Sequence, residues 1–130
     1  MKNILIIEDD RKIAMALTLR IKSAGYEATT AYDTLSGVNA AIKNPPDLVL
    51  LDICLPVGNG FTVAEEIQTL VRTPIPIIFI TASKQPGFRQ KASELGAAGY
   101  FEKPYEAEEL LAAIQNALNP PVPLITRPET

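Results

Sequence analysis

The sequence of 130 residues contains no histidine and no tryptophan, and Cys54 is its only cysteine. Without histidine the chain lacks the commonest general base, the Ser-His and Cys-His nucleophile pairs and most zinc sites. One cysteine excludes an internal disulfide and favours, weakly, a reducing compartment. Any chemistry must therefore come from carboxylates, lysine or hydroxyl groups.

Basic residues and long apolar runs are also scarce. Twelve Lys and Arg against 15 Asp and Glu give a net charge of −3, which supplies no basic stripe for a nucleic-acid backbone. The run Ile4-Leu5-Ile6-Ile7 stops at Glu8, too soon for a signal peptide, and no run reaches membrane-spanning length. We expect a cytoplasmic protein with no direct nucleic-acid binding and no membrane contact.

Length and composition indicate one globular domain, with 47% hydrophobic and 21% charged residues. The segment Pro120-Pro121-Val122-Pro123 would break any helix. We therefore expect a domain over residues 1–118, followed by a Pro-rich tail or linker over residues 119–130.

Strand-like apolar segments recur at regular intervals along the chain. The expected strands are Asn3–Ile7, Tyr26–Ala31, Leu48–Leu51, Ile75–Ile80 and Ala98–Phe101. The first, third and fourth are nearly continuous apolar runs, as in parallel strands covered on both faces, whereas the other two are more polar and suit sheet edges.

Apolar residues at helical spacing lie between these strands. The stripes are Ile13, Leu17, Ile21 and Ala24; Leu35, Val38 and Ile42; Val63, Ile67 and Leu70; and Leu110, Ile114 and Leu118. Asp10, Asp33 and Asn59 precede three of them as helix caps, and Gln85–Gly96 is the poorest helix, expected to be the most mobile. This (βα)5 order predicts an α/β, doubly wound parallel sheet with the flavodoxin-like strand order 2-1-3-4-5.

Polar residues follow the carboxyl ends of the expected strands, where open α/β sheets bind ligands. They are Glu8 and Asp9, Asp52, Thr81, and Lys103. Because the third strand is central in the 2-1-3-4-5 order, we expect Asp52 between the acid pair on one side and Thr81 and Lys103 on the other.

This arrangement suits metal-assisted phosphoryl chemistry. Crowded carboxylates repel one another unless a cation joins them, and Mg²⁺, which prefers oxygen ligands, could bind Asp9 and Asp52 directly. A carboxylate can attack phosphorus if charge on the phosphoryl oxygens is neutralised, which Lys103 and Thr81 would assist.

The motifs around these residues resemble those of two-component response-regulator receiver domains. They are Ile4-Leu5-Ile6-Ile7-Glu8-Asp9-Asp10, Asp47-Leu48-Val49-Leu50-Leu51-Asp52, Leu55-Pro56-Val57-Gly58-Asn59-Gly60, Thr81-Ala82, Gly99-Tyr100 and Lys103-Pro104. The resemblance runs from Lys2 to about Leu118 and, with all six motifs together, is highly specific.

The resemblance implies a role for each site residue. Glu8, Asp9 and the backbone carbonyl of Cys54 would join Asp52 in binding Mg²⁺, and Asp52 would accept the phosphoryl group. Thr81 and Lys103 would contact the phosphate. Tyr100 matches the aromatic switch residue, and the Lys103-Pro104 peptide is usually cis in this family.

The resemblance also implies partners. A sensor histidine kinase, a histidine phosphotransfer protein or a small phosphodonor would supply the phosphoryl group, and an output domain or protein would read the switch. Such a protein catalyses its own phosphorylation and dephosphorylation and is no conventional turnover enzyme. Self-association as a homodimer stays open.

Three departures from the common pattern limit the analogy. Asn59 stands where Asp is frequent, which we expect to change only a helix cap. Cys54 and Ser83 occupy positions that tune the lifetime of the phosphoryl group in this family. Glu106–Asn116 lacks the arginines of receivers that dimerise there to drive winged-helix transcription factors, which disfavours a DNA-binding partner domain of that type.

Three alternatives use a similar fold or chemistry. A flavodoxin-like module would bind flavin mononucleotide at this edge, but Glu8-Asp9-Asp10 would repel its phosphate. A phosphatase of the haloacid-dehalogenase type would need an acid two residues after Asp52, where Cys54 stands. The third is a receiver-fold docking protein that is never phosphorylated, against which the complete residue set argues.

Overall fold

The structure is a computed structural model that describes residues 1–120. Its strands are β1 (Asn3–Ile7), β2 (Glu27–Ala31), β3 (Leu48–Asp52), β4 (Ile77–Thr81) and β5 (Gly99–Glu102). They form one sheet in the order β2-β1-β3-β4-β5, and every neighbouring pair is parallel. The predicted α/β fold and strand order are confirmed. Strand β1 has the predicted bounds, and the ends of the other strands differ from the expected ones by at most two residues.

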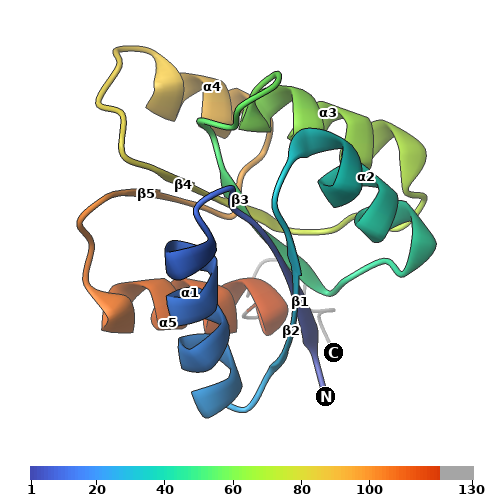
Figure 1. Cartoon of the computed structure of the whole chain (residues 1–130), viewed down its shortest axis with the longest axis vertical. Helices are drawn as coiled ribbons and strands as arrows, with labels where there is room; N and C mark the ends of the chain where they lie inside the picture. The colour runs from blue at the N-terminus through green and yellow to red at the C-terminus, as the bar shows by residue number, and fades with distance from the viewer. Residues whose placement is uncertain (121–130) are drawn as a thin grey trace, which may run out of the picture.

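A helix follows each strand. The helices are α1 (Arg11–Ser23), α2 (Thr34–Lys43), α3 (Gly60–Leu70), α4 (Phe88–Glu94) and α5 (Ala107–Leu118). Helices α2, α3 and α4 cover one face of the sheet, and α1 and α5 cover the other (Figure 1). Residues 121–130, most of the predicted tail, lie outside the described residues, so the domain boundary at residue 118 stays a prediction.

The three predicted capping residues lie directly before the first residues of α1, α2 and α3. The side chain of Asp10 accepts hydrogen bonds from the backbone N–H groups of Lys12 and Ile13, at 2.9 and 3.2 Å. Asp33 and Asn59 cap α2 and α3 in the same way. Helix α4 has only seven residues and follows Gly87, at φ 92°, without a side-chain cap. It is the shortest helix within residues 1–120, in line with the sequence, which predicted the poorest helix there; the expected mobility stays a prediction.

The sheet separates two apolar layers. Leu5, Ile7, Val49, Leu51 and Phe79 face α2, α3 and α4. The alternating residues Ile4, Ile6, Leu48, Leu50, Ile78 and Ile80 face α1 and α5. Because both faces are covered, the central strands β1, β3 and β4 are apolar except for one terminal residue each, which explains their continuous hydrophobic runs. Among residues 1–120, no helix combines the length and hydropathy needed to cross a bilayer.

Three of the predicted helical stripes were partly wrong. Ala24, in the first stripe, is exposed and lies just beyond the end of α1. Leu35 and Ile42 on α2 are 71% and 43% exposed, and Leu70 on α3 is 55% exposed. Helix α2 instead buries its small residues, because Gly37 lies so close to the sheet that an added Cβ would be 2.8 Å from Cδ1 of Ile7. This close approach turns Leu35 outward.

Candidate functional site

The carboxyl edge of the sheet gathers the residues that the sequence singled out. Glu8 directly follows β1, Asp52 ends β3 and Thr81 ends β4. Lys103 follows β5, and its backbone N–H donates to the carbonyl of Thr81 at 2.7 Å. These residues are far apart in the chain and meet because all five strands are parallel.

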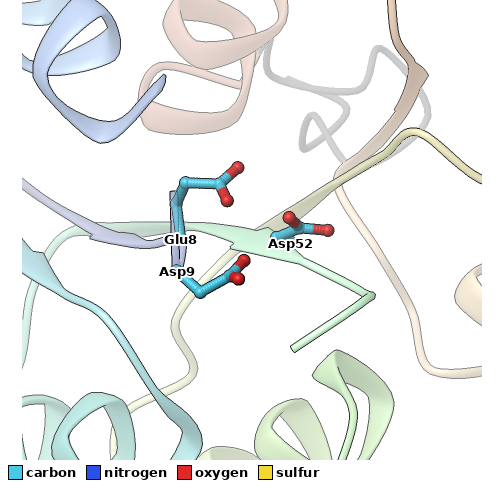
Figure 2. A group of neighbouring side chains, drawn as sticks. All are labelled: Glu8, Asp9 and Asp52. Atoms are coloured by element: carbon cyan, nitrogen blue, oxygen red, sulfur yellow. The ribbon is translucent and has the colours of Figure 1, made fainter. Parts of the chain in front are cut away.

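Three carboxylates meet at this edge, and we call Glu8, Asp9 and Asp52 the acid trio. One oxygen from each lies within 4.8 Å of the others. Figure 2 shows the three side chains converging from the ends of β1 and β3. Glu8 is 3% and Asp52 7% exposed, whereas Asp9 is open to solvent. Two of the three negative groups are therefore largely removed from water.

Lys103 is the cation of the site. Its Nζ lies 2.9 Å from Oε1 of Glu8 and 3.5 Å from Oδ2 of Asp52. The sequence placed Lys103 on the flank of Asp52 away from the acid pair, but the long side chain also reaches Glu8. Buried carboxylates need a compensating charge, and the Lys103 ammonium supplies it to both groups. The strand order alone could not show this reach.

Burial and crowding shift the protonation of the acids. Burial raises the pKa of Glu8, and the hydrogen bonds from Lys103 and from the N–H of Asp10 only partly oppose that rise. Partial burial and the neighbouring Glu8 carboxylate raise the pKa of Asp9. Burial alone would lower the pKa of Lys103, but Glu8 and Asp52 more than offset it, so that pKa is raised. The site is short of positive charge.

A divalent cation fits this donor set. All three side chains offer oxygen, at a spacing that one ion can bridge, and hard cations such as Mg²⁺ prefer carboxylates supplemented by water. Burial is the main cause of the raised pKa values of Glu8 and Asp9, and repulsion from neighbouring carboxylates adds to it. A bound cation would relieve that repulsion.

The loop after β3 orients Asp52. The backbone N–H of Cys54 donates to Oδ1 of Asp52 at 3.0 Å. Helix α3 begins against the same strand, since a Cβ on Gly60 would lie 2.5 Å from the carbonyl oxygen of Asp52. Cys54 itself is exposed. The loop thus holds Oδ1 of Asp52, while Oδ2 faces Lys103.

Thr81 lies fully buried beside this loop. Its Oγ1 accepts a hydrogen bond from the N–H of Ser83 at 3.0 Å and lies 3.7 Å from Sγ of Cys54. Sulfur is a weak hydrogen-bond partner, so little holds the hydroxyl proton of Thr81 in its present direction. The hydroxyl can turn toward a stronger acceptor.

Tyr100, the predicted switch residue, packs against the apolar layer under α4. The guanidinium of Arg89 lies over its ring, 4.6 Å from the centroid, and also 3.6 Å from Oε1 of Glu102. Sequence reasoning missed Arg89. Nothing marks it in the sequence, because its contacts join α4 to β5 and follow no helical or strand period.

A parallel 2-1-3-4-5 sheet with an acid trio and a lysine at its carboxyl edge defines a flavodoxin-like α/β protein of the CheY-like class. Residues 4–115 match the family model described as the response regulator receiver domain. The chain belongs to this family, as its motifs predicted, and the flavin-binding and phosphatase alternatives are set aside.

Curated relatives support the same assignment. The chain is 36% identical over 119 residues to the DNA-binding dual master transcriptional regulator RpaA of Synechocystis sp., covering 91% of this chain and 49% of that protein. It is 36% identical over 118 residues to the response regulator ArlR of Staphylococcus aureus, covering 91% and 53%. The chain thus spans about half the length of the curated relatives it matches.

Solved structures agree along most of the fold. The non-phosphorylated HemR receiver domain from Leptospira biflexa has a TM-score of 0.84 at 32% identity, covering 95% of this chain and 98% of that one. The chemotaxis protein CheY4 of Vibrio cholerae has a TM-score of 0.81 at 29% identity, covering 91% and 99%.

Proposed function

We propose that the protein is a phosphorylation-dependent switch of a two-component pathway and that Asp52 is its phosphoacceptor. The donor would be the phosphohistidine of a sensor histidine kinase or histidine phosphotransfer protein, or a small phosphodonor. The proposal rests on the geometry of the acid trio and Lys103. One oxygen from each acid lies within 4.8 Å of the others, and Nζ of Lys103 lies 2.9 Å from Glu8 and 3.5 Å from Asp52.

The transfer step uses the Asp52 carboxylate as nucleophile. One of its oxygens attacks the donor's phosphorus in line, the bond from phosphorus to the leaving group breaks, and its electron pair departs with that group. The product is an acyl phosphate on Asp52. Hydrolysis by water restores the carboxylate, so the protein modifies itself rather than turning over an external substrate.

Charge neutralisation is shared among several groups. Glu8, Asp9, Asp52 and the backbone carbonyl of Cys54 would hold Mg²⁺, which when bound neutralises negative charge on the phosphoryl oxygens. Lys103 already lies 3.5 Å from Asp52 and can donate to a phosphoryl oxygen there. Thr81 can turn its weakly held hydroxyl to another oxygen.

These contacts would convert phosphorylation into a change of shape. Movement of Thr81 toward the phosphoryl group frees space into which the ring of Tyr100 would turn, and this shifts the population of a pre-existing conformer. Helix α4, short and without a side-chain cap, is the element that can respond most easily. An output domain or protein would read the change, and the curated relatives, named as transcriptional regulators, support such a reader.

The test is labelling by acetyl phosphate in the presence of Mg²⁺, followed by intact-protein mass spectrometry. The parent should gain one phosphoryl group, and Asp52→Asn should gain none. Asp47→Asn is the matched control, because Asp47 precedes the same strand at its opposite end and its carboxylate accepts from the N–H of Asn3. It should label like the parent. Equal labelling of Asp52→Asn and parent would refute the assignment, and an unlabelled parent would favour a docking protein that is never phosphorylated.

A further inference from the structure

Exposed apolar side chains gather on the outer side of α2 and α3, two helices that lie side by side over one face of the sheet (Figure 1). They are Leu35 and Ile42 of α2, Leu70 of α3, and Val57 in the loop that leads to α3. Four of the seven large apolar side chains that are exposed within residues 1–120 therefore belong to this part of the surface. Leu35 and Ile42 are seven residues apart, so they project from the same side of α2.

Helix α3 lies between α2 and α4, and one contact shows which of its sides faces each neighbour (Figure 1). Gln68 reaches α4, because its Nε2 donates to the carbonyl oxygen of Leu95 at the end of that helix, at 2.8 Å. Glu66 and Leu70 are each two residues from Gln68, about 200° around the helix, so they project from the side of α3 that faces α2. What we call the α2–α3 face is made of Leu35, Ile42, Lys43, Glu66 and Leu70.

The two helices of this face differ in shape and in charge. Helix α2 presents the side chains of Leu35 and Ile42, and its only charged residue is Lys43. The outer side of α3 is an open hollow of about 640 Å³, and the only charged residues of α3, Glu65 and Glu66, both line it. These three charged residues are exposed and form no ion pair within residues 1–120. Helix α2 therefore offers apolar side chains and a positive charge, and α3 offers a hollow with a negative rim.

We propose that the α2–α3 face pairs with the same face of a second copy of this chain. A two-fold axis that lies over the boundary between α2 and α3, parallel to both helices, places α2 of each copy on α3 of the other. Both helices begin at the carboxyl edge of the sheet, so Ile42 and Leu70 lie toward the same, opposite edge. In the pair, Ile42 packs against Leu70 of the second copy and Lys43 lies beside Glu66 of the second copy, and each contact occurs twice.

Charge complementarity selects a second copy as the partner. A partner must place a negative group opposite Lys43 and a positive group opposite Glu66, with apolar side chains between them. The α2–α3 face itself has this pattern, and the two-fold axis brings the opposite signs together. None of its residues belongs to the acid trio, so the pairing goes beyond the proposed function and does not depend on phosphorylation.

The test is sedimentation velocity of the full unphosphorylated chain over a dilution series from millimolar to micromolar concentrations. The parent should form a reversible dimer. Ile42→Asp with Leu70→Asp should weaken the dimer by about tenfold or more, because its apolar centre would then contain four carboxylates. Both residues are exposed, so this variant should fold, which a thermal melt checks. Met15→Asp with Leu19→Asp, an exposed apolar pair on α1, is the matched control and should associate like the parent.

Exchange of charge across the two-fold axis tests the pairing itself. Lys43→Glu and Glu66→Lys should each weaken the dimer by about three- to tenfold, because every dimer then has two like-charge contacts. A mixture of these two variants should recover the association of the parent, since a mixed dimer has opposite charges at both contacts. Lys22→Glu and Glu108→Lys change the same charges at exposed positions on α1 and α5, and they should associate like the parent, alone and mixed.

Several results would overturn the proposal. They are a parent that stays monomeric at millimolar concentration, equal weakening by the two aspartate pairs, and a mixture of Lys43→Glu with Glu66→Lys that associates no better than either variant alone. These outcomes are distinct from those of the proposed function. A parent that is labelled by acetyl phosphate but stays monomeric would refute the pairing and leave the phosphoacceptor standing, and an unlabelled dimer would do the opposite.

Discussion

At the scale of single residues, the site is organised around a shortage of positive charge. Glu8 and Asp52 are almost fully buried, and Lys103 is the one ammonium within salt-bridge distance of them among the described residues. A buried carboxylate without a partner is costly, so Lys103 serves the folded state as well as the proposed chemistry. Removing it or adding a divalent cation should therefore have measurable and opposite effects.

We predict that Lys103→Met lowers the stability of the metal-free protein by about 1–3 kcal/mol, because Glu8 loses its partner but can take up a proton. Mg²⁺ should stabilise this variant more than the parent, since the acid trio then has no competing cation. Thermal melts with and without Mg²⁺ measure both effects. Lys91→Met, an exposed residue of α4, is the control and should change neither. An equal Mg²⁺ effect in Lys103→Met and parent would contradict the competition.

The raised pKa values of Glu8 and Asp9 predict how pH acts on the site. The pKa values of Glu8 and Asp9 in the folded protein lie above their ordinary values of 4.5 and 3.8. The two groups therefore stabilise the metal-free fold at pH below those ordinary pKa values, and this contribution is lost as pH rises through the raised pKa values. Mg²⁺ needs the deprotonated forms. Its increase of the melting temperature should be greatest at neutral pH and shrink on acidification through the raised values. An increase that does not depend on pH would rule out these carboxylates as ligands.

At the scale of secondary-structure elements, glycines let two helices approach the sheet closely. A Cβ on Gly60 would lie 2.5 Å from the backbone oxygen of Asp52, whereas one on Gly37 would meet the side chain of Ile7 at 2.8 Å. Backbone cannot yield as a side chain can. A side chain at Gly60 would therefore shift the strand end that carries Asp52, whereas one at Gly37 would disturb only the packing of α2 on the sheet.

We predict that Gly60→Ala and Gly37→Ala each lower stability by roughly 1–3 kcal/mol through overpacking. Only Gly60→Ala should also slow labelling by acetyl phosphate, because α3 would push the strand end that carries Asp52. Chemical denaturation and labelling rates separate the two effects. If Gly37→Ala slowed labelling as much as Gly60→Ala, loss of stability alone would account for both results.

At the scale of the whole molecule, the proposed switch connects the acid trio to α4 through β4 and β5. Thr81 ends β4, and Tyr100 on β5 pairs with Phe79 of β4. Arg89 of α4 contacts two residues of β5, the ring of Tyr100 and the carboxylate of Glu102. The same parallel sheet that gathers the site therefore also places the responsive helix beside it.

We predict that phosphorylation changes amide hydrogen exchange in α4 and β5 of the parent and that Tyr100→Ala loses this change while still being labelled. Tyr26→Ala is the control, because Tyr26 packs against the opposite apolar layer, and it should respond like the parent. Hydrogen exchange with mass spectrometry measures the change. A normal response in Tyr100→Ala would remove the ring from the mechanism.

The sequence by itself determined the (βα)5 order, the central and edge strands and the strand ends that carry the acid trio, Thr81 and Lys103. It could do so because these features follow from local periodicity and from the rule that parallel strands end at one edge. Tertiary structure alone decided which face α2 buries, the contact of Lys103 with Glu8 and the position of Arg89 over the ring of Tyr100. Each of these contacts depends on how closely two elements approach and on which side-chain rotamers then fit. The spacing of residues along the chain determines neither the distance between elements nor the rotamers.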